Sequence, residues 1–520
     1  MSQTGTRTAL NSLAFQSCAV FVAVSLVYWL MRSRGLDDMD SVQFAMGVGK
    51  FNLYSHRPHP PGYPLYIFAG KLLVALASLD AAKALQIVSC LGGGLFTAAW
   101  FFMCARRFGR PLAWLMAAAL TVAPMQWMTA TKALTDAPAS ALIAVELACV
   151  MIYRERRGLR WIVLAAAAGA VGAGIRPQNI GILLLILILG LAWMRAGWRH
   201  WLGALAVFIA ANLAWLIPVL WTQALLPKAQ GSWLAYPLQL LDQWRYRLDK
   251  PGNYIGAVGW DVRYFYRYTV EHVLRAWFSL GFNWTLRTAG GIVGIALYAG
   301  GAWLYVRRGI ARGHASFWRF HLPWAIVYFL IIFCTLPAAV RYHLPLLPLL
   351  LLPPLAGWWS LEGRGRWVAA ALPVMLFVPS ARLIEQNHHE FAPPIQAVRY
   401  LQKKYPEEQQ PQVRLVLWAA VRHAEWYGPR FKTVSVGHAA ANMSCDKIFS
   451  KSLAVYTDDP LFIEKTKWED VKLVKVRHFK RSTVIHHKHA NVTLYQVVRQ
   501  KDPGQTARDP KDPKAPKNKG

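Results

Sequence analysis

Three aspartates fall within four positions, Asp37, Asp38 and Asp40, directly after the first apolar segment of the chain. Neighbouring carboxylates raise one another's pKa, which suits a general base, and a group of carboxylates also suits a divalent cation. The alternative is that these side chains are simply solvated near a membrane surface. Because three negative charges are costly to hold beside anionic head groups, we expect the cluster to have a chemical use.

A stiff loop begins nineteen positions after Asp40, where residues 59–65 read His-Pro-Pro-Gly-Tyr-Pro-Leu. Proline fixes its own φ and pushes the preceding residue into an extended conformation. Gly62 allows another part of the backbone to approach closely. We therefore expect this loop to hold His59 in a fixed position.

Charged residues also stand at three breaks between later apolar runs. Lys132 and Asp136 lie at the first break, Arg176 lies at the second, and Arg341 lies at the third. A cation in such a position often only extends its head group to the membrane surface. When it does more, it binds or neutralises an anionic group there.

The elements that carry these residues are predicted to cross a membrane. The chain has 520 residues, of which 55% are hydrophobic and 16% are charged, well below the roughly 25% charged residues of soluble domains. Several apolar runs reach the ~20 residues that a helix needs to cross a bilayer. The first, Leu10–Met31, is too long for a cleavable signal peptide and lacks a small-residue cleavage site, so we expect it to be a retained span.

Five basic clusters between the apolar runs predict the topology, because Lys and Arg in short loops mark the cytoplasmic side. If all five are inside, an even number of crossings separates neighbouring clusters, and the apolar runs satisfy this condition throughout. The sequence thus predicts an α-helical polytopic membrane protein with roughly eleven spans, its N-terminus inside and its C-terminus outside. The clusters are Arg106–Arg110, Arg154–Arg160, Arg195–His200, Arg307–His314 and Glu362–Arg366.

Parity leaves one apolar run, Tyr63–Leu79, without a crossing, and we expect it to form an in-plane or re-entrant helix on the outer face. The aspartates, the His-Pro-Pro-Gly loop and the cations of the three breaks then all lie outside. Residues 228–287 form an outer loop rich in Trp, Tyr and Arg, which we expect to lie along the membrane surface.

The end of the chain differs in character. Residues 1–390 form the predicted membrane domain, whereas residues 391–500 alternate strand and helix patterns typical of a small α/β domain, here extracytoplasmic. His486, His487 and His489 could bind a metal, but a solvated turn is the better interpretation. Residues 501–520 are rich in Lys, Pro, Asp and Gly, a composition that predicts a disordered basic tail.

The net charge of +32 could indicate nucleic-acid binding. The arginines, however, gather in short clusters between apolar runs, as expected for membrane orientation, so no nucleic-acid partner is predicted. The six cysteines lie mostly in apolar runs and none has a metal-binding spacing. Neither a disulfide framework nor a zinc site is indicated.

The residues resemble the GT-C glycosyltransferases, and among them the bacterial protein O-mannosyltransferase-like branch. Asp40–Phe44 followed by His59–Tyr66 is similar to the first outer loop of that family, and the resemblance covers about residues 10–380. Related enzymes often carry a second acidic residue one or three positions after the aspartate, where this chain has Ser41 and Gln43. A divalent metal is therefore possible but not supported, and no cofactor is predicted. Three later segments fit the family too: Leu134–Pro138, Gly174–Pro177 and Arg341–Pro345.

The resemblance implies a polyprenyl-phosphate sugar donor used at the outer face of the bacterial inner membrane, with transfer of a hexosyl or pentosyl group. It implies that Asp40 is the general base of an inverting transfer. Asp37, Asp38 and Asp136 are expected to support it. Arg176, Arg341, His59 and Lys132 are expected to bind the phosphate of the donor.

Other functions stay open. A lipid or sugar transporter is one alternative, although transporters place polar groups near the bilayer midplane, whereas here they gather at one face. A non-catalytic component of a cell-envelope polysaccharide assembly system is another. The acceptor, whether a protein, a lipid or a polysaccharide, and the identity of the sugar do not follow from the sequence.

Overall fold

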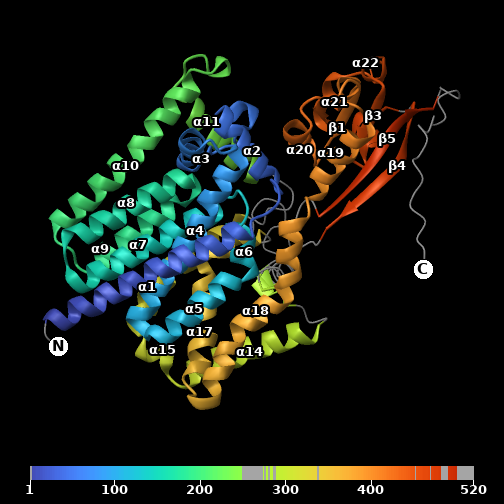
Figure 1. Ribbon diagram of the computed structural model, residues 1–520. Coiled ribbons are helices and arrows are strands. Elements are labelled where there is room, and N and C mark those ends of the chain that lie inside the picture. Colours follow the sequence, from blue (N-terminus) through green and yellow to red (C-terminus); the bar gives the residue numbers. More distant parts are fainter. Residues whose placement is uncertain are drawn as a thin grey trace. The chain divides into compact units, whose positions relative to one another are not determined.

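A computed structural model describes residues 3–248, 273–274, 277–278, 282–284, 288–335, 339–450, 452–468, 470–481 and 490–500. The chain divides into two compact units, Met1–Glu390 and Phe391–Gly520 (Figure 1). The predicted tail, the histidines of residues 486–489 and most of the aromatic-rich outer loop lie outside the described residues.

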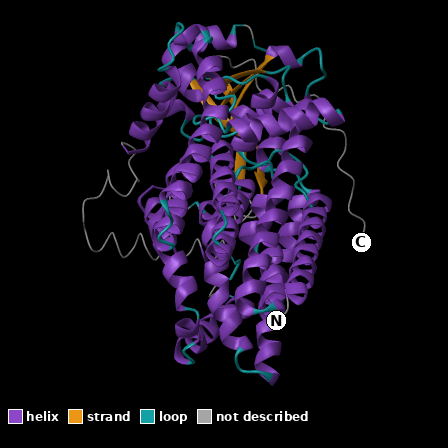
Figure 2. Cartoon of the chain, turned by 90° about the vertical axis from the view of Figure 1, so that its left-hand side faces the viewer, coloured by secondary structure: helices purple, strands orange, loops and turns teal. Residues whose placement is uncertain are grey.

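The first unit is helical, and Figure 2 shows its long helices running side by side along one common direction. In chain order the helices are α1 (Gln3–Leu30), α2 (Met39–Gly49), α3 (Pro64–Ala77), α4 (Ala81–Phe108), α5 (Arg110–Val122), α6 (Pro124–Ala130), α7 (Asp136–Arg156), α8 (Leu159–Ile175), α9 (Ile180–Trp193), α10 (Trp198–Ala224), α11 (Ala235–Leu248), α14 (Ala289–Arg307), α15 (Ile310–Gly313), α16 (Ala315–Thr335), α17 (Leu347–Trp359) and α18 (Gly363–His389). Short 3₁₀ turns join some of them: η1 (Leu53–Ser55), η2 (Pro177–Asn179), η3 (Pro227–Ala229) and η5 (Val340–Leu346).

The predicted multi-pass membrane class is confirmed. Among the described residues, seven helices are long and apolar enough to cross a membrane, or eight if α5 and α6, bent by 62° at their junction, count as one span. The other three predicted spans fall on α8, α9 and α17, which have 17, 14 and 13 residues and are shorter than the ~20 residues of a full crossing. The number eleven therefore stays a prediction.

Helix α3 forms most of the apolar run Tyr63–Leu79, which the predicted topology does not count as a membrane crossing. Its 14 residues span about 21 Å, less than the ~30 Å of a hydrocarbon core. Figure 1 shows it beside α2 and α11 at one end of the first unit. This length supports the in-plane interpretation of Tyr63–Leu79, which remains a prediction.

The five basic clusters are linked to one another at the other end of the first unit. Each contact joins two clusters, or a cluster and the turn beside the next one, so all five share one end of the helices. This is what the predicted topology requires. The contacts are Arg106 with Glu155, Arg107 with the Gly313 carbonyl, Arg157 with the Met194 carbonyl, Tyr153 with His200, and Arg308 with the Ser360 carbonyl.

Helices α4 and α7 form the centre of this unit, since 72% of the apolar window of each is buried, against 28% for α10. They pack closely because Gly92 of α4 faces the start of α7. A Cβ atom added at Gly92 would lie 2.5 Å from the backbone nitrogen of Pro138. This contact fixes the first turn of α7, where Asp136 lies.

The second unit contains a five-stranded sheet of order β2-β1-β3-β5-β4, with α19 (Pro393–Lys404) and α20 (Val421–Tyr427) preceding and following the first strand. Strands β2, β1 and β3 are parallel, and β5 runs antiparallel to both β3 and β4. The alternation of strand and helix predicted for residues 391–500 is present, and the small C-terminal α/β domain is confirmed. The strands are β1 (Val413–Leu417), β2 (Lys432–Ser435), β3 (Ala454–Thr457), β4 (Val471–Lys480) and β5 (Asn491–Arg499).

Candidate functional site

The eight residues predicted to form a site lie together at one end of the first unit. Four of them stand at the beginning or end of an element: Asp40 in the first turn of α2, Asp136 in the first turn of α7, Arg176 directly after α8, and Arg341 at the start of η5. Helix α7 runs from this end to the end that carries the basic clusters, so the two groups of charges are separated along the bundle.

Asp40 and Arg341 form an ion pair at the centre of the group. The Nη2 atom of Arg341 donates to Oδ2 of Asp40, although the two residues are 301 positions apart. The Nδ1 atom of His59 lies 3.9 Å from Oδ1 of the same carboxylate. One carboxylate therefore has an arginine on one oxygen and an imidazole beside the other.

Asp136 joins the two arginines. Nη1 of Arg176 donates to Oδ1 of Asp136 at 2.6 Å and to the Thr135 hydroxyl at 3.3 Å. Nε of Arg341 lies 3.9 Å from Oδ2 of Asp136. The carboxylate thus holds both guanidiniums in one place. Positive and negative side chains alternate along the row Arg176, Asp136, Arg341 and Asp40.

Lys132 occupies a second ion-pair group. Its Nζ atom lies 3.2 Å from Oδ2 of Asp38 and 4.0 Å from Oδ2 of Asp37. These residues connect the loop between α6 and α7 to the segment that leads from α1 into α2. Breaking such a pair would leave a charge without its partner in a buried position, so the contact fixes the segment before Asp40.

Burial separates the eight residues into two layers. The side chains of Asp38, Asp40 and Arg341 are 27%, 25% and 25% exposed, and that of His59 is 14% exposed. The remaining four are buried behind them: Asp37, Lys132, Asp136 and Arg176. A substrate can reach the first layer, whereas the second layer can act only through it.

The ring of His59 is held between two polar groups. The Tyr63 hydroxyl lies 2.9 Å from Nε2 of His59 and accepts a hydrogen bond from Nε2 of Gln178 at 3.2 Å. Burial raises the pKa of Tyr63, so the phenol stays protonated. Nδ1 is the ring atom of His59 that faces Asp40.

The His-Pro-Pro-Gly loop is fixed from several sides. Gly62 has φ +98°, which favours glycine, and a Cβ atom there would lie 3.1 Å from a methyl group of Leu53. The Tyr236 hydroxyl donates to the Pro61 carbonyl at 2.8 Å. The backbone N–H of Leu53 donates to Oε1 of Gln223 at 3.2 Å. The predicted rigidity of the loop therefore has a structural basis.

Three further residues belong to the site without being assigned a role from the sequence: Tyr63, Gln178 and Tyr342. The Tyr342 ring lies under both guanidiniums, 4.6 Å from that of Arg176 and 5.4 Å from that of Arg341. All three lie inside motifs already noted or one position beyond them. A tyrosine near a membrane surface is usually an anchor, and for that reason the sequence did not single out Tyr63 or Tyr342.

No group of three or more His, Cys, Asp or Glu side chains suited to a metal ion is present among the residues that the structure describes. Asp37, Asp38 and Asp40 are close in the sequence, but Asp37 and Asp38 face Lys132 whereas Asp40 faces Arg341. Lys132 and Arg341 occupy the places where a cation would otherwise be needed.

Comparison with solved structures shows the fold. ArnT from Cupriavidus metallidurans bound to undecaprenyl phosphate is 14% identical, with 92% of this chain and 97% of that chain covered and a TM-score of 0.51. ArnT from the same organism in the apo state is 14% identical, with 93% and 98% covered and a TM-score of 0.48. The oligosaccharyltransferase of Archaeoglobus fulgidus, in complex with Zn and sulfate, is 12% identical, with 86% and 69% covered and a TM-score of 0.47.

No protein-family model matches the chain, and no curated protein sequence matches it. The structural likeness extends over both units of the chain. The GT-C fold, which the sequence resemblance implies, is thereby confirmed.

Proposed function

We propose that this protein is an integral-membrane glycosyltransferase that moves a sugar from a polyprenyl-phosphate donor to an acceptor at the outer face of the bacterial inner membrane. The observation that carries the proposal is the accessible ion pair between Asp40 and Arg341, with His59 beside it. Glycosyl transfer from a lipid phosphate needs a base for the acceptor and a cation for the leaving group. This pair supplies one of each.

In the proposed reaction the acceptor oxygen attacks the anomeric carbon and its proton passes to Asp40. The bond between that carbon and the phosphate oxygen breaks, and its electron pair leaves with the lipid phosphate. Attack from the side opposite the leaving group inverts the configuration. Arg341 stabilises the charge that develops on the phosphate, because a guanidinium matches the geometry of a phosphate.

The ion pair also explains how the base becomes available. In the free protein Arg341 is bound to Asp40. A donor phosphate would compete for the same guanidinium, and its binding would release the carboxylate to accept a proton. Donor binding and activation of the base would thus be the same event.

The buried residues have positioning roles in this proposal. Arg176 holds Asp136, which in turn lies beside Arg341. Lys132 holds Asp37 and Asp38, which lead into α2 and so fix Asp40. His59 directs its Nδ1 atom to Asp40 and stabilises the carboxylate. Of the four predicted phosphate ligands, Arg341 is the one best placed to contact a donor.

The class of donor, the side of the membrane and the type of sugar each rest on a different support. ArnT, a structural neighbour with the same fold, is described as bound to undecaprenyl phosphate. The outer location rests on the basic clusters, which mark the opposite end as cytoplasmic. The resemblance to the mannosyltransferase-like branch makes hexosyl and pentosyl donors the first to test.

Mass spectrometry of membrane extracts tests this function. Cells that produce the wild-type chain are compared with cells that produce Arg341→Gln, with both proteins shown to be present in the membrane. We expect the wild-type extract to contain a lipid, glycan or protein that carries one additional hexose or pentose. Identical extracts from the two strains, together with unchanged pools of the donor lipid, would argue against the proposal.

A further inference from the structure

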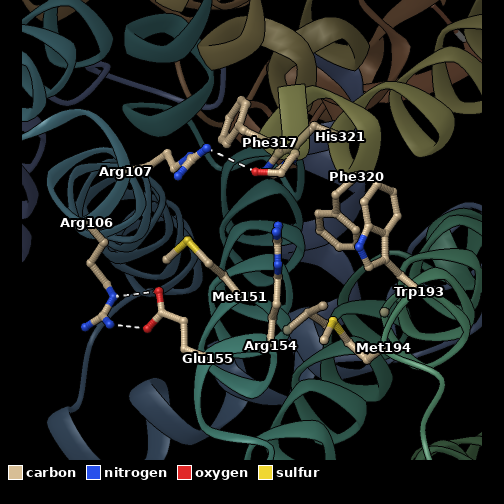
Figure 3. Close-up of a pocket in the computed structure, with 13 residues that line it drawn as sticks. Arg106, Arg107, Met151, Arg154, Glu155, Trp193, Met194, Phe317, Phe320 and His321 are labelled. Carbon is tan, nitrogen blue, oxygen red and sulfur yellow. Dashed lines mark hydrogen bonds and ion pairs between the residues drawn. The ribbon is translucent and has the colours of Figure 1, made fainter. Parts of the chain in front are cut away.

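A cavity of about 220 Å³ lies at the end of the first unit that carries the basic clusters (Figure 3). It is enclosed by the last turns of α4, α7 and α9 and the first turns of α16, through residues such as Arg107, Met151, Arg154, Trp193 and Phe320. It is distant from the candidate site, because Arg154 and Asp136 lie near opposite ends of α7, about 27 Å apart at 1.5 Å per residue.

The charge of the cavity is positive. Three arginines line it, Arg106, Arg107 and Arg154, against the single carboxylate of Glu155. That carboxylate is already bound to Arg106. The helix dipoles at the C-terminal ends of α4 and α7 favour cations, which explains why arginines lie at this end of the helices. The dipoles do not explain why three arginines line one cavity. The excess of guanidiniums suits an anionic ligand.

Arg154 is the guanidinium left for that ligand. Arg107 donates to the Ser316 hydroxyl at 3.0 Å, whereas Arg154 has no hydrogen bond or ion pair with any residue that the structure describes. Figure 3 shows Arg154 rising from α7 between Met151 on one side and Phe320 and Trp193 on the other. Membrane orientation requires only that an arginine be near the end of a span, and it does not require that the side chain enter a cavity.

The remaining wall is apolar and aromatic. The rings of Trp193 and Phe320 lie 6.5 Å apart, edge to face, and they connect α9 to α16. Trp193 is 38% exposed, so part of this aromatic wall is accessible from outside the protein. Amphipathic aromatic side chains prefer the interface between head groups and hydrocarbon.

The size of the cavity limits its ligand. A volume of 220 Å³ is roughly that of seven waters at ~30 Å³ each, and it is below the ~300 Å³ of small drug-sized sites. A phosphate ester with its first few carbon atoms fits, but acyl chains do not. Acyl chains would have to lie outside the cavity, where the accessible part of Trp193 can contact them.

We propose that this cavity binds the phosphate group of an anionic phospholipid from the inner leaflet, with Arg154 on the phosphate and the acyl chains beside Trp193. Basic pockets between membrane helices on the cytoplasmic side suit such head groups. A free phosphate ester has the same polar chemistry. The aromatic wall formed by Trp193 and Phe320 favours the lipid, because only the lipid has chains that can contact it. The site is separate from glycosyl transfer and does not depend on it.

Binding to the purified full-length chain in delipidated detergent solution tests the proposal. The probes are dioleoyl phosphatidylglycerol, dioleoylglycerol, which has the same chains without phosphate, and glycerol 3-phosphate, which has the phosphate without chains. The variants are Arg154→Gln and, as a matched control, Arg156→Gln. Arg156 is exposed on the same helix and does not line the cavity.

We expect Arg154→Gln to bind the phosphatidylglycerol about tenfold more weakly, as for the loss of one charge-assisted hydrogen bond, and Arg156→Gln to bind it like the wild type. Dioleoylglycerol should show no dependence on Arg154. The site is refuted if Arg154→Gln binds like the wild type or if Arg156→Gln loses as much. Equally tight, Arg154-dependent binding of glycerol 3-phosphate would keep the phosphate site and overturn the lipid assignment.

Discussion

Asp40 and Arg341 share an ion pair that a substrate can reach, while the similar pair of Asp136 and Arg176 lies behind it in a buried position. The same two residue types therefore have different expected consequences when they are changed. The Asp40–Arg341 pair is partly buried, at 25% exposure for each side chain, so its loss should cost more than the about 0–1 kcal/mol of a fully exposed pair and less than that of a fully buried one. Removal of one partner from a buried pair costs about 3–5 kcal/mol, because the other charge stays buried without compensation.

Two arginine variants test this difference. Arg341→Gln should lower the free energy of unfolding by less than Arg176→Gln does, and it should weaken binding of a polyprenyl phosphate by tenfold or more, since the direct phosphate ligand is lost. Arg176→Gln should lower the free energy of unfolding by about 3–5 kcal/mol. The assignment of roles fails if the stability loss belongs to Arg341→Gln and the binding loss to Arg176→Gln.

The membership of this group could be predicted from the sequence, but its pairing could not. Breaks between apolar runs carry Lys132, Asp136, Arg176 and Arg341. Counting the crossings from the basic clusters places all four on the same side of the membrane. That Arg341 would contact Asp40 depends on where the fold places η5 relative to the first turn of α2, which lies about three hundred positions earlier in the chain. Nothing in the spacing of either segment encodes that contact.

At the scale of elements, the packing of α4 against α7 positions Asp136. An alanine at Gly92 would place its Cβ atom against the Pro138 backbone, at 2.5 Å from both its nitrogen and its Cα atom. Backbone cannot give way as a flexible side chain can, so the start of α7 would have to shift.

We expect Gly92→Ala to lower the free energy of unfolding by about 1–3 kcal/mol, as overpacking does, and to reduce activity because Asp136 moves. Gly181→Ala in α9 is the control, since a Cβ atom there meets nothing within 4 Å. Thermal unfolding of both variants in the same detergent gives the comparison. Equal stability of the two would show that the close contact does not constrain α7.

Secondary structure followed from the sequence where the apolar pattern was long or was bounded by turns. The alternation of strand and helix patterns in residues 391–500 predicted the α/β character of the second unit. Helix α2 was not predicted, because Met39–Gly49 is short and follows an acidic cluster that suggests a loop. Its first turn carries Asp40, where the helix dipole favours a negative charge.

For the whole molecule, the topology is the assumption on which the location of the chemistry depends. Cysteine labelling in a background without native cysteines tests it, with Leu234→Cys on the predicted outer side and Arg156→Cys on the predicted inner side. Both positions are exposed, Leu234 at 63%. A reagent that does not cross membranes should label only Leu234→Cys in intact spheroplasts, and both after permeabilisation. Labelling of both positions before permeabilisation would contradict the topology.

The central claim is that Asp40 removes the proton of the acceptor, and its most direct test is sugar transfer by purified protein in proteoliposomes that contain a polyprenyl-phosphate sugar. Asp40→Asn keeps the size of the side chain and part of its hydrogen bonding but cannot accept the proton. Asp38→Asn is the matched control, because Asp38 is equally accessible and pairs with Lys132 instead of Arg341. We expect Asp40→Asn to bind the donor and to transfer sugar about 10²–10⁴-fold more slowly than the wild type, as for loss of a general base, while Asp38→Asn retains substantial activity. Transfer by Asp40→Asn at the wild-type rate would contradict the claim.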